Sequence, residues 1–151
     1  MEAPEIPLTA LVTKVDENYP KATLLIDPSA NSITFFKYKA TLAEARALDI
    51  TPESMRRKFK YAATRGSMLA LSVTNATEFD EIFVPNVLPL EAFSADRLTE
   101  ELLEPFKDAP NDYLFPNENF RLIFVVLTED DIPERLREFI QNGDLKVVRI
   151  V

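Results

Sequence analysis

The chain has 151 residues, 46% of them apolar, which is enough for a domain with a substantial buried core. It contains no histidine and no cysteine, which excludes Ser–His–Asp and Cys–His catalysis, disulfides, and metal sites ligated by either residue. Two glycines are too few for a phosphate-binding loop, and a net charge of −8 opposes coating of nucleic acid through the overall field.

The N-terminal part predicts three strands, at residues 8–15, 21–26 and 33–39. In the third, ITFFKYK, the alternation places Phe35, Lys37 and Lys39 on one side. Segments rich in Pro, Asn and Asp separate the three, as in the turns of a meander. We therefore expect N-terminal antiparallel strands.

A helical hairpin is predicted next. Thr41, with Glu44 three residues later, has the pattern of a capping box and predicts a helix over residues 41–48. Thr51 and Pro52 predict the start of a second helix, which Gly66 would end. The apolar residues of the second helix recur at helical spacing, and they are Met55, Phe59, Ala62 and Ala63.

The middle of the chain is less regular. Strands at residues 68–73 and 81–84 suggest a hairpin, and a helix over residues 94–104 would end at Pro105. Residues 85–118 contain five prolines in an acidic setting and are predicted to form a connecting belt.

The C-terminal part predicts a strand, a helix and a strand. The near-continuous apolar run at residues 120–127 is typical of a central strand buried on both faces. Asp131 and Glu134 suggest a capping box for a helix that Gly143 ends, and residues 145–151 form a last strand. This order permits a parallel crossover. We expect one α+β domain over residues 1–151, or a piece of a longer chain, since the sequence ends inside a strand pattern.

Residues 41–60 resemble the helix-turn-helix of bacterial and phage transcription regulators. The likeness rests on the small Ala45 within the first helix, on Leu48 at its end, and on Ile50 in the turn. Asp49 stands where the family usually has glycine, and Lys58 stands where it prefers an apolar residue. With the flanking strands, the likeness extends to a winged helix over residues 33–84.

The resemblance implies that the second helix enters a DNA major groove. The residues it would use, with two supporting lysines, are Lys37, Lys39, Arg56, Arg57, Lys60 and Thr64. The same pattern also suits two packed helices with a solvated basic face. FFKYK and KFKY interleave aromatic and basic residues, as single-strand binders do, although strand alternation gives such patterns too.

Charge is distributed unevenly along the chain. Residues 37–65 hold eight Lys/Arg against three Asp/Glu, whereas residues 76–118 hold two against eleven. The acidic stretch suggests a protein interface, with Glu78, Asp80, Glu81, Glu100, Glu101 and Glu104 as its candidate residues. A basic and an acidic region on one chain can also pair head-to-tail in an oligomer.

We therefore expect a non-enzymatic regulatory protein that binds another protein, in the manner of an inhibitor, an immunity protein or a viral assembly factor. Nucleic-acid binding through residues 37–65 is the alternative. No cofactor and no metal are expected. The acidic, proline-rich start MEAPEIP is unlike a secretory signal, and no apolar run reaches the length of a membrane helix, so we expect a cytoplasmic protein without a membrane partner.

Overall fold

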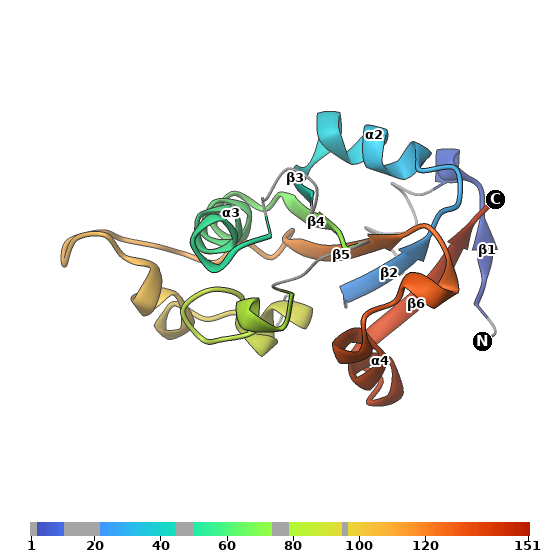
Figure 1. Ribbon diagram of the computed structural model, residues 1–151. Coiled ribbons are helices and arrows are strands. Elements are labelled where there is room, and N and C mark those ends of the chain that lie inside the picture. Colours follow the sequence, from blue (N-terminus) through green and yellow to red (C-terminus); the bar gives the residue numbers. More distant parts are fainter. Residues whose placement is uncertain (1–2, 11–21, 45–49, 74–78, 95–96) are drawn as a thin grey trace.

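The structure is a computed structural model, and it describes residues 3–10, 22–44, 50–73, 79–94 and 97–151. The strands are β1 (Glu5–Ile6), β2 (Ala22–Ile26), β3 (Thr41–Glu44), β4 (Met68–Ser72), β5 (Arg121–Val126) and β6 (Leu145–Ile150). The α-helices are α2 (Asn31–Lys39), α3 (Pro52–Arg65) and α4 (Glu134–Gln141). Short 3₁₀ helices are η1 (Leu8–Ala10), η3 (Phe79–Ile82), η4 (Leu90–Phe93), η6 (Glu101–Phe106) and η7 (Glu129–Asp131). Figure 1 shows their arrangement.

All six strands belong to one sheet, in the order β1-β6-β2-β5-β4-β3, and every neighbouring pair is parallel. The prediction of an α+β fold with N-terminal antiparallel strands is therefore wrong, and the fold is of the α/β type. The central strands explain the preference for parallel pairing, because β2 is buried along its whole length and β5 along all but its first residue. Strands buried on both faces are typical of parallel sheets.

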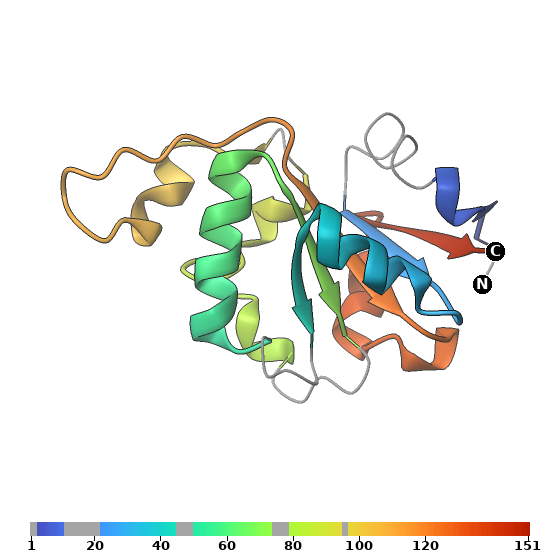
Figure 2. The ribbon, with the colours of Figure 1, turned by 90° about the horizontal axis from the view of Figure 1, so that it is seen from above.

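Helices cover both faces of the sheet (Figures 1 and 2). The connection from β2 to β3 runs through α2 on one face, and those from β3 to β4 and from β5 to β6 run through α3 and α4 on the other. The chain moves along the sheet in opposite directions in these two parts. Because parallel crossovers are right-handed, opposite directions of travel require opposite faces.

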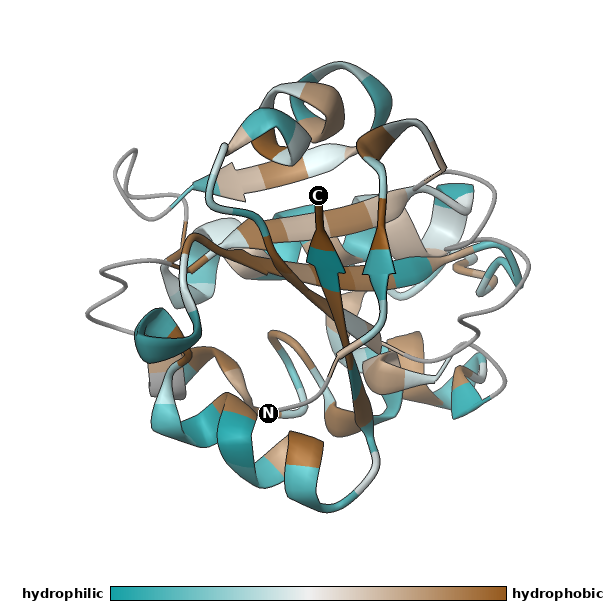
Figure 3. Ribbon diagram, turned by 90° about the vertical axis from the view of Figure 1, so that its right-hand side faces the viewer, coloured by the Kyte–Doolittle hydropathy of each residue, from teal (hydrophilic) through white to brown (hydrophobic). Residues whose placement is uncertain are grey.

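A separate hydrophobic cluster fills the space on each side of the sheet. Under α2, Phe36 packs with Leu25 and Ile123. On the other face, α3 and α4 pack with the β4–β5 connection, and phenylalanine rings contact one another at centroid distances of 4.5 to 6.1 Å. These rings are Phe79, Phe83, Phe93, Phe124 and Phe139. Figure 3 shows the hydrophobic residues concentrated along the strands and the hydrophilic ones on the outer sides of the helices.

The segment predicted as a strand over residues 33–39 lies in helix α2. The N-cap of this helix is Ala30, with a positive φ of 60°, and the Asp27 carboxylate accepts hydrogen bonds from the backbone N–H of Ser29 and, in the first turn of the helix, of Ser32. Ser32 and Phe36, four residues apart, face the sheet, which is helical periodicity. Part of the first predicted strand, Leu8–Ala10, is the 3₁₀ helix η1, and residues 11–15 lie outside the described residues.

The first helix of the predicted hairpin is also different. Residues Thr41–Glu44 form strand β3, which pairs with β4, so the helix predicted from Thr41 is wrong there, and residues 45–48 are not described. Residues 81–84 were predicted as a strand, but the 3₁₀ helix η3 occupies Phe79–Ile82. The end of the predicted 94–104 helix is the 3₁₀ helix η6, which continues through Pro105, whereas residues 98–100 are not helical and residues 95–96 are not described.

The second helix of the hairpin and the C-terminal unit agree with the prediction. Thr51 caps α3, Pro52 begins it, and Gly66 ends it with a positive φ of 73°. The apolar run at residues 120–127 contains β5, and β6 follows α4 in a parallel crossover. The capping box lies earlier than predicted, between Thr128 and Asp131 at η7, because Pro133 precedes α4. None of the helices described is long and apolar enough to cross a membrane.

Candidate functional site

Helix α3 has an apolar face and a cationic face. The buried face consists of Met55, Phe59, Ala62 and Ala63, which pack on the sheet. The outward face carries Arg56, Arg57, Lys58, Lys60 and Arg65. This division follows from the sequence, since apolar residues at helical spacing turn every intervening residue outward.

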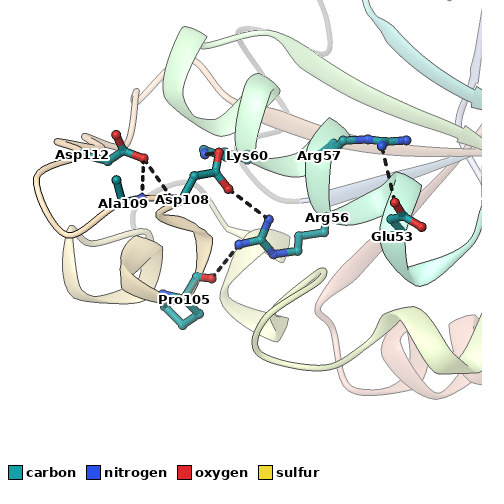
Figure 4. Close-up of polar contacts among 8 residues, drawn as sticks. All are labelled: Glu53, Arg56, Arg57, Lys60, Pro105, Asp108, Ala109 and Asp112. Atoms are coloured by element: carbon teal, nitrogen blue, oxygen red, sulfur yellow. Dashed lines mark hydrogen bonds and ion pairs between the residues drawn. The ribbon is translucent and has the colours of Figure 1, made fainter.

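Two of the α3 cations are held by the acidic belt of the same chain (Figure 4). Lys60 Nζ lies 2.8 Å from Asp108 Oδ2, and the Arg56 guanidinium lies 3.9 Å from Asp108 Oδ1. Arg56 also donates a 2.9 Å hydrogen bond to the carbonyl of Pro105 and lies over the Phe106 ring. The hydrogen bond from Lys60, its charge and the charge of Arg56 together hold the pKa of Asp108 below its usual value. We call this set the α3 clamp: Arg56, Lys60, Pro105 and Asp108.

The clamp fixes one end of a long connection between η6 and β5. We call residues 107–118 the arm. At its other end the backbone N–H of Asn117 donates a 2.8 Å hydrogen bond to the carbonyl of Ala63 in α3. Near the clamp, Asp112 accepts hydrogen bonds from the backbone N–H groups of Asp108 and Ala109. Both ends of the arm are thus attached to α3, and Figures 1 and 2 show its middle extending past α3, away from the sheet.

The middle of the arm presents two aromatic side chains to solvent. Tyr113 is 81% exposed and Phe115 is 57% exposed, whereas Leu114 between them is half-buried against the core. Alternation of this kind is what an extended chain produces when one side faces the protein. No glycine occurs in the arm, and its two prolines, Pro110 and Pro116, flank the aromatic pair.

Of the six predicted nucleic-acid contacts, the four on α3 lie along one groove, and these are Arg56, Arg57, Lys60 and Thr64. Lys37 and Lys39 lie on α2, in the layer on the other side of the sheet from α3. Arg56 and Lys60 belong to the clamp. The hydroxyl of Thr64 donates to the carbonyl of Lys60 in its own helix.

The predicted acidic interface is brought together only in part. Glu100, Glu101 and Glu104 are exposed and lie at or next to η6, with Glu104 2.8 Å from the ammonium group of Lys107. Glu81 is exposed on η3. Asp80 also lies on η3, but its side chain is outside the described residues, as is Glu78.

Asp108, Tyr113 and Phe115 are not among the site residues predicted from the sequence. The sequence does contain a pattern that indicates Tyr113 and Phe115, because PNDYLFP places these two aromatic residues between prolines, in an acidic segment where no strand is predicted. The alternation of exposure along this segment depends on its attachment to α3, which only the tertiary structure reveals.

Comparisons with known proteins do not identify the chain: no family model matches it, and no curated protein matches it either. Within the described ranges no group of three or more acidic residues is arranged to hold a metal ion.

Proposed function

We propose that this chain is a non-enzymatic protein-binding module whose arm inserts Tyr113 and Phe115 into another protein. The observation that carries the proposal is the exposure of both rings on a segment that projects from the fold and is attached at both ends. Aromatic residues are enriched among the few side chains that dominate binding energy at protein interfaces. Cytoplasmic location, for which the acidic, proline-rich start of the sequence is the support, is part of the same proposal.

The attachments of the arm to α3 expose the two aromatic rings and also favour binding. A segment that is ordered only on binding loses conformational freedom at that moment, and this loss weakens the complex. The clamp and the Asn117–Ala63 hydrogen bond restrict the arm before a partner arrives. The α3 cations thereby act on the protein's own arm, which gives them a role other than contact with phosphate.

The test is affinity capture with the immobilised protein from extract of the cells that express it, followed by quantitative mass spectrometry. We expect Tyr113→Ala/Phe115→Ala to lose at least one specific partner, by about tenfold or more, since aromatic anchors contribute about 2 kcal/mol or more. Tyr38→Ala is the matched control, because Tyr38 is 79% exposed on α2, away from the arm. Equal capture by the arm variant and the unmodified protein would refute the proposal.

Nucleic-acid binding is the second candidate, and one observation favours it. A groove of about 420 Å³ on the outward face of α3 is lined by four cations, one aromatic ring, Thr64 and two carboxylates, Glu53 and Asp108. The cations and the ring are Arg56, Arg57, Lys60, Arg65 and Tyr61. Asp108 lies in the same groove and would repel a phosphate. If α3 binds nucleic acid, Asp108→Asn should raise the affinity for labelled DNA in fluorescence anisotropy, and added salt should lower it steeply. No binding at low salt by either protein would eliminate this candidate.

A further inference from the structure

Strand β3 is the last strand at one side of the sheet. It pairs with β4 on its inner side, and no described strand pairs with its outer side. Such an edge carries backbone N–H and C=O groups that another chain can bind as an added strand. At only four residues, β3 matches a short extended segment.

A groove of about 450 Å³ lies beside this edge, between β3 and the outward face of α3. It is lined by Thr41 at the start of β3 and by Ser54, Arg57, Lys58 and Tyr61 of α3. The part of α3 that faces β3 is therefore different from the clamp, which uses Arg56 and Lys60.

The groove is lined by two cations, Arg57 and Lys58, and, in the part of the chain that the structure describes, by no acidic residue. Lys58 has no ion-pair partner among the described residues. The side chain of Arg57 is 69% exposed, and within the described ranges its ion-pair partner is Glu53, at 3.7 Å. A ligand that fits the groove should therefore be acidic.

We propose that an extended acidic segment of another protein binds in this groove and pairs with β3 as a seventh strand of the sheet. Its backbone hydrogen-bonds to the edge of β3, its carboxylates face Arg57 and Lys58, and the exposed ring of Tyr61 contacts its apolar atoms. This site lies outside the arm and concerns a different contact from the one made by Tyr113 and Phe115.

A peptide fits these features better than a nucleic acid does. The edge of β3 offers alternating backbone donors and acceptors along an extended line, and these pair with the backbone of another polypeptide. A nucleic acid would use the cations but leave the strand edge unpaired. The two ligands are thus distinguished by whether binding involves the amides of residues 41–44.

The experiment uses the full chain and three fluorescein-labelled decapeptides of Thr, Val and a charged residue in alternation. The first carries Glu, the second replaces every Glu by Lys, and the third keeps Glu but has two central prolines. We expect the acidic peptide to bind, and the lysine and proline peptides to bind about tenfold more weakly or not at all. Hydrogen exchange should show slower exchange within residues 41–44 when the acidic peptide is bound.

Lys58→Glu tests the site within the protein, with Lys37→Glu as its matched control. Both are single charge reversals on helices, but Lys37 lies on α2 and outside the groove. We expect Lys58→Glu to weaken binding of the acidic peptide about tenfold and Lys37→Glu to weaken it less than threefold. Tyr113→Ala/Phe115→Ala should bind the peptide normally, so failure here is distinguishable from failure of the arm as a binding element.

Four results would overturn the inference: equal binding of the proline peptide, equal binding by Lys58→Glu, unchanged exchange at residues 41–44, or displacement of the peptide by DNA without any change at those amides. If β3 were protected without peptide in a concentration-dependent dimer, a second copy of this chain would occupy the edge. That result would also replace the proposed acidic partner.

Discussion

Asp27 binds the backbone at the start of helix α2. Its side chain is 0% exposed, and its carboxylate accepts hydrogen bonds from the backbone N–H and the hydroxyl of both Ser29 and Ser32. Burial raises the pKa of Asp27, but these four hydrogen bonds more than offset it, and the pKa lies below its usual value. The ionised carboxylate therefore stabilises the start of α2.

We expect Asp27→Ala to lower the free energy of unfolding by about 1 to 3 kcal/mol at pH 7, because it leaves buried donors without an acceptor. Since the folded-state pKa is the lower one, this stabilisation is present above about pH 4 and is lost as the pH falls through the folded-state pKa. Urea denaturation at pH 7 and at pH 3 measures the difference, which should be smaller at pH 3. Asp130→Ala is the control, because Asp130 is exposed, and a change of the same size there would contradict this role of Asp27.

Asp108 is a second acidic residue with a defined role, at the surface. Replacing it with Asn removes the charge that Lys60 and Arg56 share but keeps the shape of the side chain. We expect the amides of residues 107–118 to exchange about twofold to fivefold faster, with little change elsewhere, because exposed ion pairs are weak. High salt should produce part of the same effect in the unmodified protein. Glu118→Gln removes a charge from the same arm without touching the clamp, so an equal effect there would show that general charge, not the clamp, holds the arm.

At the scale of single elements, the end of α3 and the end of the arm depend on each other at Gly66. Its φ of 73° favours glycine, and a Cβ there would lie 2.5 Å from Asn117 Oδ1. That oxygen accepts a hydrogen bond from the backbone N–H of Asn119. The close approach of helix and arm therefore requires a residue without a side chain.

Gly143 provides a matched comparison, since its φ is 80° but a Cβ there would contact nothing within 4 Å. We expect Gly143→Ala to lower the free energy of unfolding by about 1 kcal/mol through backbone strain alone. Gly66→Ala should cost about 1 kcal/mol more, because Asn117 must also move and weaken its hydrogen bond. Urea denaturation of both variants measures the difference, and equal losses would mean that Asn117 adjusts without cost.

The elements that the sequence predicts correctly are those whose pattern of apolar residues fits only one type of secondary structure. β5 is an apolar run too short for most helices and too continuous for an amphipathic strand. For α3, the N-cap residue, the apolar residues at helical spacing and the glycine after the last turn all predict the same helix. ITFFKYK fits either period: read as alternation it predicts a strand, but Ser32 and Phe36 fit a helix face. That error, together with the helix predicted from Thr41 where strand β3 lies, hid the strand–helix–strand order of the N-terminal part, and with it the parallel sheet.

The candidate site was harder to predict than the fold, for a physical reason. The cations of α3 are evident in the sequence, but two of them, Arg56 and Lys60, pair with Asp108, which lies 48 residues beyond Lys60. Likewise, the contacts that make Tyr113 face outward are made by residues on either side of it in the arm and by α3. Distant contacts of this kind leave no local pattern in the chain.

At the scale of the whole molecule, the two hydrophobic clusters share the same strands, because alternate residues of β5 face opposite sides. Phe124 belongs to the cluster under α3 and α4, while Ile123 and Val125 belong to the one under α2. A sheet buried on both faces cannot keep its strand pairing if either layer leaves, since the exposed apolar surface would be large. We therefore expect α2 and α4 to unfold together with the sheet.

Phe36→Ala and Phe124→Ala test this coupling from opposite faces. Each removes a fully buried ring, and each should lower the free energy of unfolding by about 3 to 5 kcal/mol. The important expectation is that both variants retain one urea transition, with the same midpoint by circular dichroism and by hydrogen exchange within α2, α4 and β5. If Phe36→Ala instead released α2 at a lower urea concentration than β5, the α2 layer would be a separate unit of stability, and the sheet would be held mainly by the cluster that contains Phe124.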